Sequence, residues 1–390
     1  MPVMILFCGL TVDIGMLELR QLQLQNAADA AALGGQIESE RGTNNWVAQG
    51  QSDASANGFT NGVNGVTVTL VQQPSTGAYA GHYDAIQATV SQTVQTVFMG
   101  TLNGGHVTLQ AQSVALITPC VYLTGTGSLQ RYSLDVANGS FNGDSCPIYI
   151  NTGMNVESYG QMAVNATNVA GSSGSSSNPG FLYPSPVYNA AKITDPLAAI
   201  TSPSFSGTCN HTSYNLSSGS ATLSPGNYCK GITLSSSTVT MNPGLYIITG
   251  GVTWSGATVS GTGVTLFFTQ GGGASYGQIV IQSGSNVTIS APNDTSSGAI
   301  PGVLIFTDRN WTHTNQNDIY FGNSTIRGDG IWYLPGAGLW MQSCGTFGGP
   351  HYMGIVADHL TTGGTIVNPT NNYSYVVSGN PFVPIGGLVQ

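Results

Sequence analysis

The chain has very few charged side chains. Only 6% of its 390 residues are Asp, Glu, Lys or Arg, whereas a typical soluble domain has about 25%. The seven Lys and Arg residues form no cluster, and the net charge is −9. This pattern argues against a nucleic-acid partner and against binding to an anionic membrane surface, since both need clustered basic groups. The polar surface must therefore come from Ser, Thr, Asn, Gln and backbone groups.

The chain also lacks the short motifs of common catalytic sites. It has no Ser-His-Asp signature, no His-Glu-x-x-His pair, no Walker loop and no dinucleotide fingerprint. None of the six cysteines forms a C-x-x-C pair or lies near a histidine at zinc-finger spacing. The sequence therefore predicts no enzymatic activity, no catalytic residues, no cofactor and no metal centre. A structural calcium ion held in a turn is the one exception left open.

Five cysteines lie beyond the hydrophobic N-terminus, at Cys120, Cys146, Cys209, Cys229 and Cys344. Cys120 with Cys146, and Cys209 with Cys229, would each close a short loop in strand-rich sequence. We interpret these pairs as two disulfides, which implies an oxidising compartment and leaves Cys344 over. The alternative is five free, buried thiols.

Apolar residues dominate positions 1–19, interrupted by Gly9, Asp13 and Gly15. The run is shorter than the roughly 20 apolar residues of a membrane span, and it lacks the basic start of a secretory signal peptide. Either part of a longer span is missing upstream, or the helix is buried among copies of itself in a fibre. In both cases we expect residues 1–32 to mediate anchoring or polymerisation. The residues assigned to this role are Phe7, Leu10, Val12, Asp13, Ile14, Leu17 and Leu24.

Helical spacing continues beyond Leu17, is weakened at Gly34-Gly35, and extends to Asn57-Gly58, whose glycine suits a helix C-cap. We therefore assign residues 1–58 to an N-terminal helical segment. Alternating strands follow, and they predict a small antiparallel sheet over residues 59–118, a pilin-like α+β module. The expected strands are 63–71, 85–94 and 107–116.

From residue 119 to residue 390 the chain repeats weakly and has no helical signal. Pro225-Gly-Asn-Tyr228 recurs as Pro243-Gly-Leu-Tyr246, and Gly231-Ile-Thr-Leu234 recurs at Gly251 and again at Gly263. Short strands with small-residue corners at a repeat near 20 residues predict a right-handed parallel β-helix. A β-sandwich or several small β-domains is the alternative fold.

The densest polar set in this region would be the place for a polysaccharide-active site, because such enzymes need paired carboxylates or a calcium cluster. We favour a structural role instead, with Asp308–Arg309 and Arg327–Asp329 as ion pairs or turn caps. The set is Asp308, Arg309, His313, Asp318, Arg327, Asp329, His351, Asp358 and His359.

The segment Gly9–Leu33, with Asp13-Ile-Gly15 and Leu24-Gln-Asn-Ala-Ala-Asp-Ala-Ala-Ala-Leu33, resembles the N-terminus of the Flp/Tad pilus-assembly TadG-like family. Motifs such as Cys146-Pro-Ile-Tyr-Ile-Asn151 and Gly302–Arg309 resemble the β-helical part of some TadG-like proteins. The resemblance implies a bacterial structural protein of the cell envelope, the cell surface or an extracellular filament.

In this interpretation the N-terminal helix associates with copies of itself, with other pilus components or with the membrane. The alternative is an adhesin that binds glycans through exposed aromatic residues, and a less favoured one is a polysaccharide-active β-helix enzyme. The aromatic candidates are Trp311, Tyr320, Trp332, Tyr333 and Trp340.

Overall fold

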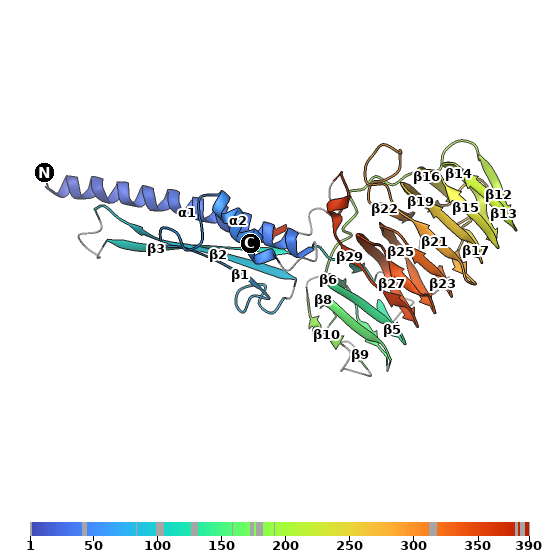
Figure 1. Cartoon of the computed structure of the whole chain (residues 1–390), viewed down its shortest axis with the longest axis horizontal. Helices are drawn as coiled ribbons and strands as arrows, with labels where there is room; N and C mark the ends of the chain where they lie inside the picture. The colour runs from blue at the N-terminus through green and yellow to red at the C-terminus, as the bar shows by residue number, and fades with distance from the viewer. Residues whose placement is uncertain are drawn as a thin grey trace. The chain divides into compact units, whose positions relative to one another are not determined.

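A computed structural model of the chain forms two compact units, one made of Met1–Thr118 with Ile385–Gln390 and the other of Pro119–Pro384 (Figure 1). The predicted architecture is confirmed: a helix with a small antiparallel sheet is followed by a parallel β-helix. The structure describes residues 2–40, 45–82, 84–98, 105–125, 132–157, 159–171, 175–176, 182–190, 192–311, 318–378, 381–382 and 387–389.

The first unit packs helices against an antiparallel sheet of order β1-β2-β3-β30. Strands β1 to β3 lie within a few residues of the predicted ones. Strand β30 comes from the end of the chain, which the sequence analysis had placed in the β-helix, and it pairs with β3. The elements are α1 (Pro2–Glu40), α2 (Trp46–Ala56), β1 (Val66–Gln72), β2 (Ala85–Gln95), β3 (His106–Leu116) and β30 (Gly387–Val389).

Helix α1 continues through Gly34 and Gly35, which do not break it. Glycines in the two helices allow α1 and α2 to pack closely. A Cβ on Gly34 would lie 1.7 Å from an oxygen of Asp53, and a Cβ on Gly50 would lie 2.7 Å from the carbonyl oxygen of Ala31. Helix α2 ends as predicted, because Gly58 follows it with a φ of +89°. The core between helices and sheet is made of small and branched side chains, among them Leu24, Ala28, Ala31, Ile86 and Val90.

The second unit is a solenoid of parallel strands, and this pairing rules out the β-sandwich alternative. Its strands are β4 (Val121–Leu123), β5 (Leu134–Ala137), β6 (Ser140–Ile150), β7 (Met154–Val156), β8 (Gln161–Val169), β9 (Ser175–Ser176), β10 (Leu182–Tyr183), β11 (Val187–Tyr188), β12 (His211–Leu216), β13 (Gly219–Leu223), β14 (Gly226–Ser235), β15 (Ser237–Met241), β16 (Gly244–Thr249), β17 (Val252–Ser255), β18 (Thr258–Gly261), β19 (Val264–Thr269), β20 (Ile279–Gln282), β21 (Asn286–Ile289), β22 (Val303–Thr307), β23 (Ile319–Gly322), β24 (Thr325–Arg327), β25 (Gly330–Gln342), β26 (Thr346–Gly348), β27 (Tyr352–Gly363), β28 (Ile366–Val367) and β29 (Thr370–Asn371).

Rows of apolar side chains run along the inside of the solenoid, one residue from each coil. Residues one coil apart are about 4.8 Å apart, so each row is a continuous apolar stack. One row is Ile232, Val252, Ile279, Ile319, Leu339, Leu360, Leu134 and Met154. Another is Val239, Val259, Val287, Ile326, Phe347, Val367, Phe141 and Met162. All of these residues are buried, which explains how a chain with so few charges forms a large core.

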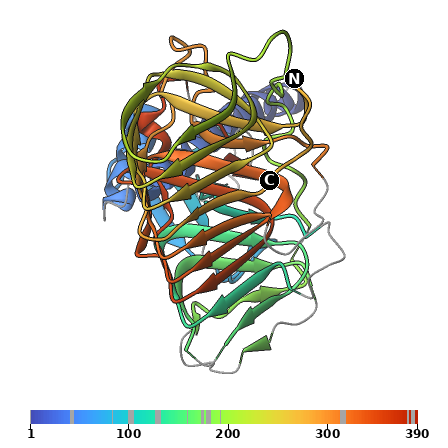
Figure 2. The ribbon, with the colours of Figure 1, turned by 90° about the vertical axis from the view of Figure 1, so that its right-hand side faces the viewer.

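The coils do not stack in chain order. The chain enters the solenoid at β4 and winds from there to β11, and it then crosses to β12 at the opposite end (Figures 1 and 2). From β12 it winds back until β27 pairs in parallel with β4 and β5. We call this junction, with partners Ile355–Val121 and Leu360–Leu134, the seam. The first and last coils of the sequence thus meet inside the solenoid and not at its ends.

The predicted repeats fall on the coils only in part. Gly231 and Gly251 both have positive φ, and Ile232 and Leu234 pair with Val252 and Trp254, so these two copies are in register. The predicted third copy, at Gly263, is wrong, because its Val264 pairs with Gly244 in a different stack of strands. Both predicted disulfides are formed: Cys120–Cys146 joins neighbouring coils at the seam, and Cys209–Cys229 joins the two coils at the β12 end. Cys344 is a free, buried thiol.

The seam provides a test of the coil order. Leu134 and Leu360 are buried partners across it, and they are far apart in sequence. We expect Leu134→Ala and Leu360→Ala each to lower the free energy of unfolding of the solenoid by about 2–5 kcal/mol. The double variant should cost clearly less than the sum, because the two side chains pack on each other. Calorimetry of the solenoid transition measures this, with the exposed Val71→Ala as a neutral control, and strictly additive losses would contradict the seam.

The C-terminal end of α1 provides a second test. The Glu40 carboxylate accepts the Thr118 N–H at 2.5 Å and a hydrogen bond from the Gln36 amide, and burial raises its pKa to about 7. The folded protein therefore holds a proton that the unfolded chain releases above about pH 4.5. This stabilisation is complete below pH 4.5 and is lost as the pH rises through 7.

We expect the free energy of unfolding of the first unit to fall by up to about 3 kcal/mol across this range. Glu40→Gln should flatten the profile. A hydrogen bond to Asp84 raises the pKa of His82, which adds a dependence of the same sign, so the difference between wild type and variant isolates Glu40. Identical profiles of melting temperature against pH would contradict the assignment.

Candidate functional site: the outward face of the N-terminal helix

The side of α1 that faces the sheet is polar in its first half. Asp13 is only 2% exposed, and its carboxylate accepts the backbone N–H groups of Val97 at 3.0 Å and Phe98 at 2.7 Å, just beyond β2. Arg20 donates from Nε to the Gln92 side chain at 2.7 Å. Asp13, which interrupts the apolar run in the sequence, therefore attaches the helix to the sheet.

Two glutamines extend these contacts toward the middle of the helix. Gln21 donates its side-chain amide to the Gln110 carbonyl oxygen at 2.8 Å, and Gln25 donates to the Gln112 carbonyl oxygen at 3.1 Å. Both acceptors belong to β3, whose backbone would otherwise rely on water for these bonds. Hydrogen bonds thus hold this half of α1 against the sheet, and apolar packing takes over only from Leu24 onward.

The opposite side of the same helix half is apolar and exposed. We call it the outward face, made of Val12 (52% exposed), Met16 (55%), Leu19 (59%) and Leu22 (66%). Ile14 is also exposed (44%), but residues two apart do not share a helix face, so it points to another side. A surface helix of a soluble domain shows the reverse pattern, with its apolar stripe on the core and polar residues outside. A contiguous exposed apolar patch marks a surface for a protein or membrane partner. The outward face is therefore the candidate functional site.

A groove of about 490 Å³ lies beside the outward face, between α1 and the end of β2. Met16, Leu17 and Leu19 line its helix side, and residues 92–96 line its strand side. The exposed apolar surface thus extends from the helix into a concave site where a partner side chain can be buried.

The structure divides the residues predicted for anchoring and assembly into three sets. Val12 and Ile14 are exposed, Val12 on the outward face and Ile14 on another side; Leu10 and Leu17 are partly buried, and Asp13 and Leu24 are buried. The side chain of Phe7 lies outside the described residues. Leu24 belongs to the core of the first unit, so its role there is packing.

The sequence analysis missed Met16, Leu19 and Leu22, which are the most exposed apolar residues among the helix side chains that the structure describes, from residue 9 onward. The signal was present, because positions 12, 16 and 19 follow the i, i+4, i+7 spacing of one helix face. It went unread because apolar residues occupy all sides of this helix half, and only the sheet identifies the side that faces outward. Over the described residues, no helix is both long and apolar enough to cross a lipid bilayer.

The polar residues predicted in the β-helix do not form one site. Asp308 caps a turn by accepting the Asn310 N–H at 2.9 Å, and it also accepts the Thr269 hydroxyl at 2.7 Å. The predicted ion pairs are not formed. Arg309 pairs with Asp195 and not with Asp308, and Asp329 pairs with His351 and not with Arg327. The buried Asp358 and His359 contact each other at 3.3 Å. His313 lies outside the described residues.

Within the part of the chain that the structure describes, no three His, Cys, Asp or Glu side chains lie close enough together to bind a metal ion.

The aromatic candidates for glycan binding do not form one surface either. Trp311, Trp332 and Tyr333 are buried, while Tyr320 and Trp340 are only partly exposed and lie edge to face at 5.6 Å. The polar set therefore consists of separate local contacts.

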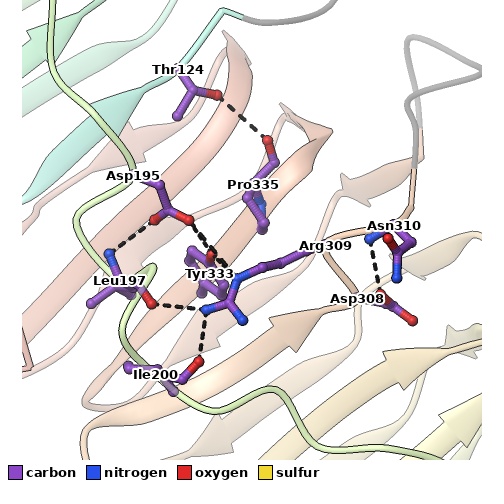
Figure 3. Close-up of polar contacts among 9 residues, drawn as sticks. All are labelled: Thr124, Asp195, Leu197, Ile200, Asp308, Arg309, Asn310, Tyr333 and Pro335. Atoms are coloured by element: carbon purple, nitrogen blue, oxygen red, sulfur yellow. Dashed lines mark hydrogen bonds and ion pairs between the residues drawn. The ribbon is translucent and has the colours of Figure 1, made fainter.

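The most extensive of these contacts holds the crossover segment, residues 192–210, which joins the two halves of the solenoid (Figure 3). Arg309 donates to the carbonyl oxygens of Leu197 and Ile200, both at 2.9 Å, and to the Tyr333 hydroxyl at 2.7 Å. The Tyr333 hydroxyl in turn donates to Asp195, which lies 4.0 Å from Arg309. Burial and the Asp195 carboxylate raise the pKa of Tyr333, so its hydroxyl stays protonated as a donor.

Comparison with known proteins identifies the N-terminal segment. Residues 1–49 match the family model described as putative Flp pilus-assembly TadE/G-like, which confirms the predicted family resemblance over these residues. The match covers α1 and the start of α2, and so includes the whole outward face. No curated protein and no solved structure matches the chain.

The Arg309 contacts lead to a prediction for the crossover segment. Arg309→Ala should lower the stability of the solenoid by about 1–3 kcal/mol and speed proteolytic cleavage within residues 192–210. Arg309→Lys should not restore protection, because an ammonium group lacks the planar fork that reaches two carbonyls and a hydroxyl together. Limited proteolysis with mass spectrometry measures the cleavage. The exposed Arg327→Ala is the control, and equal cleavage in both alanine variants would contradict the role of Arg309.

Proposed function

We propose that this chain is a structural component of a Tad-type pilus system in the bacterial cell envelope. In this proposal, the outward face of α1 binds the apolar surface of a pilus component, either a second copy or another subunit, and the β-helix is displayed outside the cytoplasm. The two disulfides suit an oxidising compartment. The TadE/G-like match at residues 1–49, which includes the outward face, supports assigning that face to a Tad-type system.

The observation that carries the proposal is that α1 leaves large apolar side chains in water while polar side chains attach it to the sheet. Asp13 accepts hydrogen bonds from the sheet unit, and Arg20 and Gln21 donate to it, so the helix cannot rotate to bury its exposed apolar side chains without breaking these bonds. Each large apolar side chain left in water forgoes about 1.5–3 kcal/mol of burial energy. A partner that covers Leu19 and Leu22 recovers this energy, and the groove beside them receives its side chains.

The outward face cannot be tested by deleting the helix, because the same helix contributes to the core. Residues 24–32 include Leu24, Ala28, Ala31 and Ala32 of the core, so removing residues 1–32 would unfold the first unit and test nothing. Point substitutions on the outward face leave the core and the hydrogen bonds to the sheet intact. Glutamine is suitable because it is polar and a good helix former.

We expect the triple variant Val12→Gln, Leu19→Gln, Leu22→Gln to lose at least tenfold in association with its partner while keeping its melting temperature. The matched control replaces three similarly exposed apolar residues of the same unit by glutamine: Ile37 (46% exposed), Val63 (48%) and Val71 (48%). Co-purification from envelope fractions of cells that make the full chain measures association. Loss of association in the control but not in the triple variant would contradict the proposal.

A photo-crosslinking residue at position 22 identifies the partner directly. We expect adducts with a protein of the pilus system, and their mass distinguishes a second copy from another subunit. The same residue at position 63 should give none. Adducts with lipid alone, or no adducts at position 22, would overturn the proposal.

A further inference from the structure

A cleft of about 390 Å³ lies on the β-helix, in the unit that does not contain α1. Neighbouring coils form its wall, and the loop after β21 and the short helix η2 (Tyr373–Tyr375) border it. Its volume falls within the range of small-ligand pockets, about 300–1,000 Å³. Neither the TadE/G-like match nor the outward face explains this site.

An Asp–His pair forms one side of the cleft. The Asp329 carboxylate accepts from His351 Nδ1 at 2.6 Å, and it also accepts the backbone N–H groups of His351 at 2.8 Å and Tyr352 at 3.2 Å. Because an ionised carboxylate can only accept, Nδ1 carries the hydrogen. In the neutral imidazole, Nε2 is then the ring nitrogen that can accept a hydrogen bond from a ligand.

An aromatic platform adjoins this pair. The Tyr375 ring stacks on the His351 ring with the centroids 3.6 Å apart and an interplanar angle of 29°. Tyr375 is nevertheless 49% exposed, so His351 covers only one of its faces. Stacking on one face and the Asp329 hydrogen bonds fix both rings in place, which lowers the entropic cost of binding a ligand on the other face.

The polar lining of the cleft determines the class of ligand. It contains the carboxylates of Asp294 and Asp329, the hydroxyls of Ser290, Ser296 and Ser297, and no Lys or Arg. An anionic ligand would meet two carboxylates and no compensating cation, so it is disfavoured. Ser296 donates two hydrogen bonds to Asp294, which lower the pKa of that carboxyl and keep it ionised as an acceptor.

We propose that this cleft binds a neutral oligosaccharide. An apolar sugar face stacks on Tyr375, and the sugar hydroxyls donate to His351 Nε2 and to Asp294. Two carboxylates, an exposed aromatic ring and the absence of Lys and Arg from the lining match a ligand rich in hydroxyl donors and free of charge. The site is in the other unit from the outward face, so it does not depend on the proposed assembly function.

The experiment uses the full chain on an array of immobilised neutral and acidic oligosaccharides, followed by calorimetric titration of the best neutral binder. We expect binding to at least one neutral oligosaccharide and none to uronate-containing or sialylated ones. Tyr375→Ala should weaken the association constant about tenfold through loss of the stacking surface. His351→Phe keeps an aromatic ring but removes the acceptor, and it should weaken binding by a similar factor.

Tyr159→Ala is the matched control, because Tyr159 is a 75% exposed tyrosine of the same unit and does not line the cleft. Its binding should equal that of the wild type, and all variants should share the wild-type melting temperature. Three results would each overturn the proposal: no binding to any neutral oligosaccharide, a preference for acidic ones, or binding that survives both Tyr375→Ala and His351→Phe. If the triple glutamine variant of the outward face kept its partner association while the cleft bound sugar as expected, the result would count against the assembly function alone.

Discussion

The parallel pairing of β27 and β28 with β4, β5 and β6 is the interaction on which the β-helix depends. Without it the solenoid would be two separate stacks, one from β4 to β11 and one from β12 to β28, each with an open end where apolar rows meet water. Pairing of Leu360 with Leu134 and of Val367 with Phe141 makes each row continuous across the seam. A solenoid is stabilised by contacts between neighbouring coils, so closing the seam links the two stacks into one cooperative core.

This coil order requires a long connection, and polar side chains of the β-helix hydrogen-bond to its backbone. The crossover segment must run along the stack, where its backbone groups have no strand partners. Asn151 exchanges two hydrogen bonds with the backbone of Ile193 near one end, Arg309 holds Leu197 and Ile200, and Asn227 holds the carbonyls of Ser206 and Thr208 near the other end. Charged side chains are rare in this chain, and one of them, Arg309, together with two amide side chains satisfies the backbone of this one segment.

Local patterns predicted the local structure well. Alternation of apolar residues located strands β1 to β3, the glycine after Asn57 marked the end of α2, and cysteine spacing gave both disulfides. The coil order could not be predicted, because the seam joins residues more than two hundred positions apart and no local signal marks such a pairing. The repeat at Gly263 misled for a related reason: Gly-Val-Thr suits a strand after a tight corner on any face of the solenoid.

The sequence predicted that the N-terminal helix is the binding element, but it did not predict which side of the helix faces outward. The apolar start of α1 identified the helix as the binding element, yet Asp13 looked like a defect in a membrane span. Its buried carboxylate, with two backbone donors, shows that it positions the helix. Only the sheet reveals which side of a helix that is apolar all round faces outward. The Asp329–His351 pair was among the candidate residues, but its stacking partner Tyr375 lies in irregular sequence and was not found.

The position of the seam has a mechanical consequence. The solenoid begins and ends in sequence at interior coils, since residue 119 precedes β4 and β29 pairs with β27. A tensile load passing from the first unit is therefore applied at mid-stack, and the end coils carry none of it. Cys120 immediately precedes β4, and its bond to Cys146 passes the force covalently to the next coil. The disulfide thereby reinforces the strand on which a pulling force between the two units would act first.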